Sequence, residues 1–292
     1  MIPPHGRNDA HITVGSGQIT LHIACPARAD YIPPAMSAPL PWVIGHRGAS
    51  GVAPENTIAA FQKALEQGAR MIELDVHLTK DGVPVVIHDE RVDRTTNGVG
   101  PVADWTLQEL KHLDAGMWFD RRFRGERIPT LRETLRWARG KMKLFLELKT
   151  NKVDYPGIEQ AVLTEAREEE MAEEVMVGSF NAQTVARARE QARGISVGGI
   201  LEDLRGLDAF LAETGGFDVV SAGHVWITPE TVKAVHARRL PLFVWTVDEE
   251  DEMRRCASLG VVGIMTDFPA VLARVLSEGG VPSGPPGVPG VA

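Results

Sequence analysis

Short apolar runs alternate with longer amphipathic segments through the central part of the chain. Apolar runs of this length, bounded by turn residues, are typical of strands that are buried on both faces. The pattern predicts eight strands, at residues 42–45, 71–75, 143–148, 174–179, 196–200, 217–222, 241–247 and 261–266.

Segments with apolar residues at helical spacing lie between most of these strands. In the first of them, Ile58, Phe61 and Leu65 recur three to four positions apart. Thr57 can cap the start of this helix, and Gly68 follows its end. The pattern predicts helices at residues 57–67, 130–139, 157–170, 181–193, 203–213, 229–238 and 249–258.

This alternation of strands and helices indicates an α/β fold. Eight strands in a core that we place at residues 42–276 favour a (β/α)8 TIM barrel. A doubly wound open sheet is the alternative. Such a sheet usually carries a glycine-rich phosphate loop after its first strand, and GHRGASG at residues 45–51 lacks that spacing.

One segment, VHLTKDGVPVVIHD at residues 76–89, departs from the alternation. Its KDG tripeptide is a turn signal between two alternating runs, which lie too close together for a crossover helix. We therefore expect an antiparallel β-hairpin that extends the second strand. A turn closed around Asp81 and Gly82 would place His88 opposite Asp75.

The two ends of the chain differ from the core in composition. Residues 1–41 are rich in Pro, Gly and Ala, and we expect them to form a flexible appendage. Met36 is a candidate for the true start, because MSAPLPWVIGHRG leads directly into the first strand. Residues 277–292 form a Pro/Gly-rich tail that cannot build a core, so we expect it to be disordered.

Composition narrows the range of partners. The chain has 292 residues and a formal net charge of −8, so no excess of positive charge attracts nucleic acid. It has neither a secretory signal nor an apolar run long enough to cross a membrane. We expect a cytoplasmic protein without stable membrane association, and the oligomeric state stays open. Its two cysteines, Cys25 and Cys256, imply no disulfide framework.

Acidic side chains occur at the ends of two predicted strands. Glu73 and Asp75 are two positions apart and share one face of the second strand, and Glu147 ends the third. In a barrel these ends open on one face, where three carboxylates would repel one another. A hard divalent cation is the simplest compensation. We therefore expect one Mg²⁺ or Ca²⁺ ion at Glu73, Asp75 and Glu147.

The other polar residues at these strand ends suit a phosphate group. Arg47 can grip a phosphoryl oxygen with its planar guanidinium, and Lys149 adds a point charge. His46 follows the first strand, and the hairpin returns His88 to the same mouth. Two imidazoles beside a phosphate form an acid/base pair for P–O cleavage.

Each of these motifs is weak by itself. A lone His-Arg-Gly occurs by chance, and a Glu-x-Asp pair usually marks a solvated strand face. His77 shares the face of the acids but lies beyond the barrel rim, so we leave it out. Trp245 lies near the end of a late strand, Phe180 follows VGS at the end of the fourth, and each suits either a pocket wall or ordinary core.

Taken together, the motifs resemble those of the glycerophosphodiester phosphodiesterases, a family similar to the phosphatidylinositol phospholipase C barrels. The matching pieces run from VIGHRGASGVAPENTIAAFQKALEQGARMIELDVHLTKDGVPVVIHD through DRTTNGVGPVADWTLQEL, RIPTLRETL, LFLELK, VGSF, VWTVD and GIMTDFP. They occur in family order and cover about residues 43–272.

The resemblance implies a metal-dependent TIM-barrel hydrolase. Its substrates would be small glycerophosphodiesters such as glycerophosphocholine and glycerophosphoethanolamine, and its products sn-glycerol 3-phosphate and a free alcohol. The resemblance assigns the metal to the three acids, acid/base catalysis to the two histidines, and phosphate contacts to Arg47 and Lys149. Glu55 and Asn56 match the family's polar loop beneath the site.

Two other functions stay open on the sequence alone. One is a lysophospholipase D-like hydrolysis of single-chain phospholipids, with the loop around Trp118 and Phe119 as an apolar lip. The other is a barrel that binds phosphodiesters without cleaving them. The pair of histidines counts against a pure binder, because binding has no need of two groups that transfer protons.

Overall fold

The computed structural model describes residues 13–14, 17–18 and 40–278. Strands β1 (Thr13–Val14) and β2 (Gly17–Gln18) pair antiparallel in the N-terminal part of the chain. Most of the predicted appendage, Met36 and nearly all of the predicted tail lie outside the described residues. Those predictions therefore stay predictions.

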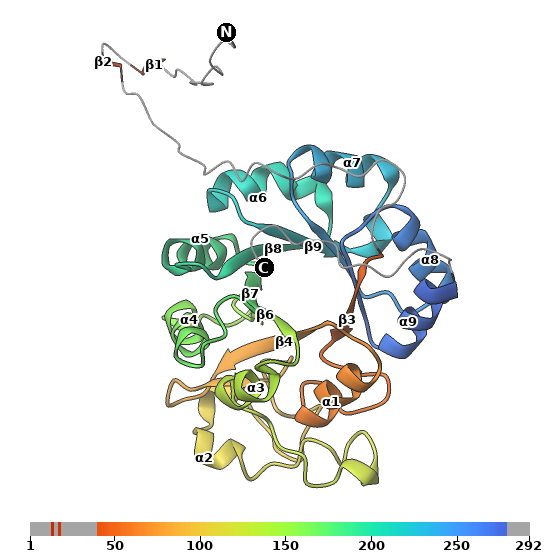
Figure 1. The fold of residues 1–292 in the computed structure, drawn as a ribbon. Helices are drawn as coiled ribbons and strands as arrows, with labels where there is room; N and C mark the ends of the chain where they lie inside the picture. The colour runs from red at the N-terminus through yellow and green to blue at the C-terminus, as the bar shows by residue number, and fades with distance from the viewer. Residues whose placement is uncertain (1–12, 15–16, 19–39, 279–292) are drawn as a thin grey trace. The chain divides into compact units, whose positions relative to one another are not determined.

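Eight parallel strands form a closed barrel (Figure 1), as the sequence predicts. Each strand pairs with the next around the ring, and the last pairs with the first. The strands are β3 (Trp42–His46), β4 (Met71–Leu78), β6 (Lys143–Leu148), β7 (Val175–Ser179), β8 (Ser196–Leu201), β9 (Val219–Gly223), β10 (Leu242–Trp245) and β11 (Gly263–Thr266).

Successive side chains of each strand point alternately into the barrel and toward the helices, so the apolar core has an inner and an outer part. On β3, Ile44 points into the barrel and its neighbour Val43 packs against the outer layer, and on β4 Met71 and Ile72 divide in the same way. Inside the barrel, bulky buried side chains such as Phe145 and Phe243 fill the centre, and in barrels of this kind the site lies at the carboxyl end of the strands.

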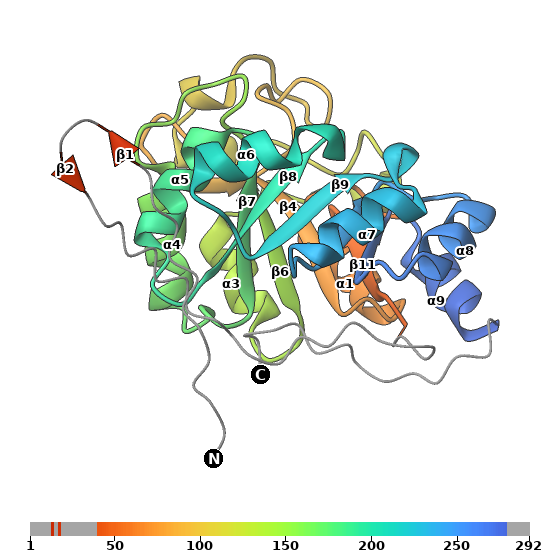
Figure 2. The ribbon, with the colours of Figure 1, turned by 90° about the horizontal axis from the view of Figure 1, so that it is seen from above.

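Helices surround the ring of strands (Figures 1 and 2). They are α1 (Ile58–Glu66), α3 (Leu131–Ala138), α4 (Ile158–Glu168), α5 (Ala182–Gln191), α6 (Leu207–Thr214), α7 (Pro229–Ala237), α8 (Glu250–Ser258) and α9 (Pro269–Glu278). Short 3-10 turns, η3 (Leu204–Gly206) and η4 (His224–Trp226), precede α6 and α7. All seven predicted helices are present.

Local capping explains where these helices begin. The Thr57 side chain accepts a hydrogen bond from the Ala60 amide at the start of α1, and Thr130 forms a capping box with Glu133 at α3. Helix α9 was not predicted, although Pro269 at its first turn is a recognised start signal. No helix within residues 40–278 combines the length and apolar character needed to span a bilayer.

The hairpin after β4 is present, but its predicted register is wrong. Strand β5 (Pro84–Val86) runs antiparallel to β4 with Val76 opposite Val86, so Asp75 faces Ile87 rather than His88. The connection has three residues instead of two, because Gly82 adopts a left-handed φ of 76° and closes back onto Thr79. One additional loop residue shifts every pair by one position.

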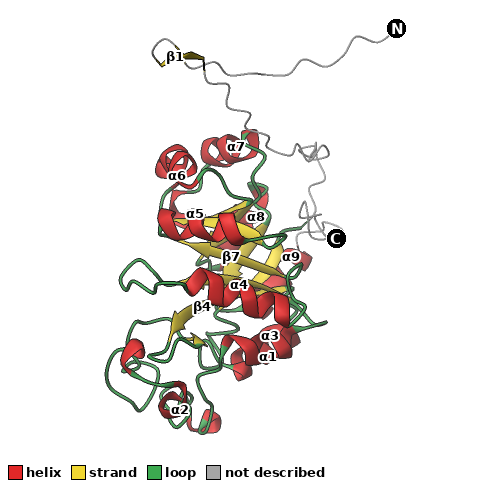
Figure 3. Cartoon of the chain, turned by 90° about the vertical axis from the view of Figure 1, so that its left-hand side faces the viewer, coloured by secondary structure: helices red, strands yellow, loops and turns green. Residues whose placement is uncertain are grey.

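An excursion of residues 89–128 links the hairpin to α3. It carries two 3-10 turns, η1 (Val102–Asp104) and η2 (Arg121–Phe123), and the short helix α2 (Leu107–Leu110). Figures 1 and 3 show it beside β4 at the edge of the ring. It packs around its own apolar cluster, which includes Val92, Val102 and Leu110.

Candidate active site

Three carboxylates meet at the carboxyl ends of β4 and β6. Strand pairing places Asp75 beside Glu147 and Glu73 beside His46. One oxygen from each of Glu73, Asp75 and Glu147 lies within 4.8 Å of the others, and all three residues are buried. The structure therefore brings together the three acids that the sequence predicts as metal ligands.

The charges of this acidic cluster are only partly balanced. Burial, reinforced by the other two acids, raises the pKa of Glu73 well above its ordinary value, and burial beside Asp75 raises the pKa of Glu147 to about 7. Burial also acts to raise the pKa of Asp75, but Lys149 and Arg47 outweigh it and hold that pKa below the ordinary value. The positive charges of Lys149 and Arg47 therefore do not offset the burial and mutual repulsion of all three carboxylates.

The remaining oxygen atoms of the cluster fit a divalent cation. Asp75 Oδ1 and Glu147 Oε1 are buried, and both face the side chain of Lys149. The ammonium of Lys149 lies 3.3 Å and 2.8 Å from these two oxygens as an ion pair. Carboxylate oxygens are the donors that Mg²⁺ and Ca²⁺ prefer, and three buried acids here present one oxygen each to a common place, so the residues present fit such an ion.

Each predicted histidine is oriented by a carboxylate. His46 Nδ1 lies 2.7 Å from Asp267 Oδ1, and His88 Nδ1 lies 2.7 Å from Asp89 Oδ1. A carboxylate at Nδ1 favours the tautomer with its proton there and leaves Nε2 free for chemistry. His46 Nε2 lies 4.0 Å from Glu73 Oε2, at the edge of the acidic cluster. Burial lowers the pKa of His88.

The loop after β3 carries Arg47 and Asn56 into the site in left-handed backbone conformations, each with a φ of 56°. Such values are uncommon outside glycine and concentrate at functional sites. The Arg47 guanidinium contacts Glu55 at 2.9 Å and Asp75 at 3.5 Å. The Asn56 side chain donates to Asp75 Oδ2 at 2.8 Å. The two predicted loop residues therefore support Arg47 and Asp75 from behind.

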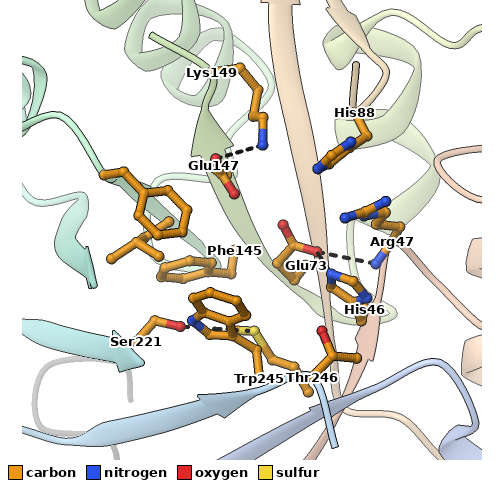
Figure 4. Close-up of a pocket in the computed structure, with 13 residues that line it drawn as sticks. His46, Arg47, Glu73, His88, Phe145, Glu147, Lys149, Ser221, Trp245 and Thr246 are labelled. Carbon is orange, nitrogen blue, oxygen red and sulfur yellow. Dashed lines mark hydrogen bonds and ion pairs between the residues drawn. The ribbon is translucent and has the colours of Figure 1, made fainter. Parts of the chain in front are cut away.

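A cavity of about 130 Å³ opens beside these groups (Figure 4). Its polar side is formed by both histidines, Arg47, Lys149 and the glutamates, as predicted. The rings of Phe180 and Trp245, 5.7 Å apart, help to form the opposite apolar side. Sequence reasoning missed the other lining residues there, which are Phe145, Ile200, Ser221, Thr246 and Met265.

Three residues that the sequence analysis did not assign to the site, Asp267, Asp89 and His77, contact His46 or His88. Asp267 follows β11 directly in the GIMTDFP segment, and Asp89 follows His88, so position after a strand was the available signal. His77 is buried, and its Nε2 lies 3.1 Å from the backbone carbonyl of His88. Burial lowers the pKa of His77 to about 4, so it stays neutral and serves as a structural support for His88.

Comparison with known proteins agrees with this geometry. The family model described as "Glycerophosphoryl diester phosphodiesterase family" matches residues 46–271. The chain belongs to this family. It is therefore a phosphoric diester hydrolase of the glycerophosphodiester phosphodiesterase type, which confirms the resemblance drawn from the motifs.

Relatives within this family match about four fifths of the chain. The chain is 43% identical over 248 residues to a glycerophosphodiester phosphodiesterase of Caldanaerobacter subterraneus, which covers 82% of this chain and 98% of the relative. It is 37% identical over 243 residues to one of Bacillus altitudinis, covering 81% and 98% of the two chains.

Solved structures show the same fold. One is a glycerophosphodiester phosphodiesterase of Agrobacterium tumefaciens, 32% identical, with a TM-score of 0.72 and coverage of 80% of this chain and 100% of that chain. Another is an Oleispira antarctica phosphodiesterase in complex with the product sn-glycerol-3-phosphate, 29% identical, with a TM-score of 0.73 and coverage of 82% and 97%.

Proposed function

We propose that the chain hydrolyses small glycerophosphodiesters, such as glycerophosphocholine and glycerophosphoethanolamine, to sn-glycerol 3-phosphate and a free alcohol. The observation that carries the proposal is one cavity lined by two imidazoles, two cationic side chains and buried carboxylates. The product named for the Oleispira structure supports the same reaction.

Glu73, Asp75 and Glu147 are the residues that would hold one Mg²⁺ or Ca²⁺ ion. Such an ion, when bound, polarises phosphoryl oxygens and offsets the carboxylate charge. Arg47 and Lys149 add two fixed cations at the same wall, and the buried Arg47 Nε–H donates to no hydrogen-bond acceptor among the described residues. A phosphoryl oxygen of the substrate would accept from these donors.

His46 and His88 would move the protons. His46, held by Asp267, takes a proton from the attacking hydroxyl at Nε2. His88 gives a proton to the departing alcohol oxygen as the P–O bond breaks. Its lowered pKa makes its protonated form a stronger acid, which suits donation to an alkoxide. Phe180 and Trp245 would wall the substrate on the apolar side.

Two nucleophiles are compatible with this arrangement. Water can attack phosphorus directly, or the glycerol hydroxyl next to the phosphoester can attack first. The second route releases the alcohol and leaves a cyclic phosphate, which water then opens to glycerol 3-phosphate. We propose the cyclic route, and quenched single-turnover reactions followed by ³¹P NMR would detect the cyclic ester or exclude it.

The central test is turnover of glycerophosphocholine by the full chain with Mg²⁺, Ca²⁺ or EDTA. We expect release of glycerol 3-phosphate with at least one of the two metals. EDTA should abolish the release, and added metal should restore it. Release that persists in EDTA would contradict the metal-dependent mechanism.

A second candidate is the lysophospholipase D-like activity. The observation that favours it is the apolar side of the cavity, together with Met117 and Trp118, which are exposed on the excursion. We expect glycerophosphocholine to be the better substrate in kcat/KM, because the small cavity suits a glycerol unit. A higher kcat/KM for lysophosphatidylcholine in the same assay would reverse this order.

The contact between Asp267 and His46 leads to a separate prediction. Asp267→Asn should lower kcat by about 10–100-fold, the scale typical of a lost orienting partner. An amide does not select the required tautomer of His46 as a carboxylate does. The measurement is kcat for glycerophosphocholine beside Asp208→Asn, which changes an exposed acid that pairs with Arg238. Equal kcat values in the two variants would remove Asp267 from the mechanism.

A further inference from the structure

Arg94, on the excursion, contacts two carboxylates at once. Its Nε and Nη2 atoms donate to the two oxygens of Asp89 at 2.7 Å and 3.2 Å. Its Nη1 and Nη2 atoms donate to the two oxygens of Glu55 at 2.7 Å and 2.8 Å. A guanidinium that forms paired hydrogen bonds with two carboxylates sets the orientation of both.

These two carboxylates are the groups that stand behind the cavity. Asp89 Oδ1 lies 2.7 Å from His88 Nδ1, and Glu55 Oε1 accepts from Arg47 Nη1 at 2.9 Å. Arg94 therefore reaches one histidine and one cation of the candidate site, each through a single intervening carboxylate. Arg94 does not line the cavity.

The electrostatics of this chain of contacts agree with a holding role. Burial acts to raise the pKa of Glu55, but Arg94 and Arg47 lower it below its ordinary value. For Asp89, burial is likewise opposed by Arg94 and His88, and the pKa falls to about 2. Both acids are thus kept charged, and Arg94 offsets the repulsion between them.

Contacts of the neighbouring residues fix the backbone around Arg94, and this limits the positions that its side chain can reach. Val92 is fully buried in the apolar cluster of the excursion. The Thr96 hydroxyl donates to the Val92 carbonyl at 2.7 Å and accepts from the Gly98 amide at 2.9 Å. The Arg94 side chain is 44% exposed, but its paired contacts with two carboxylates and its anchored backbone distinguish it from an isolated surface ion pair, which contributes little.

We propose that Arg94 is a positioning residue for the reaction. It holds Asp89 and Glu55 so that the His88 imidazole and the Arg47 guanidinium keep their places in the cavity, and it thereby couples the excursion to the barrel mouth. This inference rests on the proposed function, since His88 and Arg47 are given their roles there.

The first test compares Arg94→Ala with Arg91→Ala. Arg91 is a neighbouring arginine whose side chain pairs with Asp93 at 3.0 Å. We expect Arg94→Ala to lower kcat/KM for glycerophosphocholine by about 10–100-fold, the scale of an outer hydrogen-bonding partner, and Arg91→Ala to change it less than twofold. Low millimolar guanidinium chloride should partly restore kcat in Arg94→Ala alone, because the free cation can occupy the same place.

A double-mutant cycle separates positioning from general support of the fold. Asp89→Asn removes the carboxylate through which Arg94 reaches His88. If Arg94 acts through that carboxylate, the fall in log kcat of the double variant is smaller than the sum of the falls in the two single variants. The reason is that either single change already disrupts the same contact with His88. Additive effects, no rescue by guanidinium, or a kcat/KM of Arg94→Ala equal to that of Arg91→Ala would overturn the proposal.

Two further measurements keep the result interpretable. Arg94→Lys retains a charge but cannot pair with both carboxylates, so we expect an intermediate kcat, and its thermal midpoint shows whether folding is intact. Binding of sn-glycerol 3-phosphate by calorimetry in MgCl₂ should weaken in Arg94→Ala and not in Arg91→Ala. If the unmutated chain hydrolyses no diester, the proposed function fails, and this binding comparison alone decides for or against Arg94.

Discussion

Alanine in place of His46 or His88 is expected to lower kcat for glycerophosphocholine by about 10²–10⁴-fold, the usual scale for a lost acid or base. Both imidazoles line the cavity. A carboxylate at Nδ1 fixes the orientation of each ring and leaves Nε2 for proton transfer. Steady-state kinetics with saturating metal measures the effect on kcat apart from any effect on metal binding.

His112→Ala provides the control for these two variants, because His112 is an exposed residue on the excursion. Its kcat should match that of the unmutated chain. Near-full activity in His46→Ala or His88→Ala would show that the substituted histidine does not transfer a proton in the reaction.

The second large effect concerns the acidic cluster. Glu73→Gln should weaken Mg²⁺ or Ca²⁺ binding by more than the roughly 10–100-fold that follows loss of an outer partner, because a direct ligand is lost. The same change should raise the thermal midpoint of the metal-free protein. Burial and two neighbouring acids raise the pKa of Glu73, so its charge opposes folding when no cation is bound.

The control for this variant is Glu159→Gln. Glu159 is also buried, but it pairs with Arg187 at 2.7 Å, away from the cluster. Its loss should lower the thermal midpoint and leave metal affinity unchanged. Calorimetric titration with MgCl₂ and CaCl₂, with melting curves in EDTA, gives both quantities. A Glu73→Gln protein that is simply unfolded would show that Glu73 is structural.

The raised pKa of Glu147, about 7, also predicts how the stability of the metal-free protein depends on pH. Between the ordinary value of 4.5 and about 7, the folded state holds a proton that the unfolded state has released. This contribution to the free energy of unfolding is therefore favourable at low pH and is lost as the pH rises through that window. Melting curves of the unmutated chain and Glu147→Gln in EDTA should diverge across it, and excess MgCl₂ should reverse the loss.

Much of the fold was predictable because its signals are local. Each barrel strand is an apolar run, and most helices begin after a threonine or asparagine that caps the first turn or have a proline as their first residue. The acids at Glu73 and Asp75 share a face because alternate residues of a strand point the same way. Glu147 joins them because parallel strands of a barrel present their carboxyl ends together.

The register of the hairpin after β4 could not be predicted from local sequence signals. Asp81 and Gly82 identify the turn, but the choice between a two-residue and a three-residue connection depends on the φ of Gly82 and on the bond back to Thr79. That choice moves His88 off the position opposite Asp75. His88 still reaches the cavity, because its backbone carbonyl is held by His77 and its ring by Asp89.

The sequence by itself determined the family, the eight-stranded barrel and the charged residues and histidines that line the cavity at its mouth, because strand periodicity and short motifs encode them locally. Only the tertiary structure decided which groups hold those residues in place. Asp267 reaches His46 across 221 positions, and Arg94 reaches Glu55 across 39. Contacts of that kind arise when the ring closes β11 onto β3 and the excursion folds back, and no spacing in the chain records them.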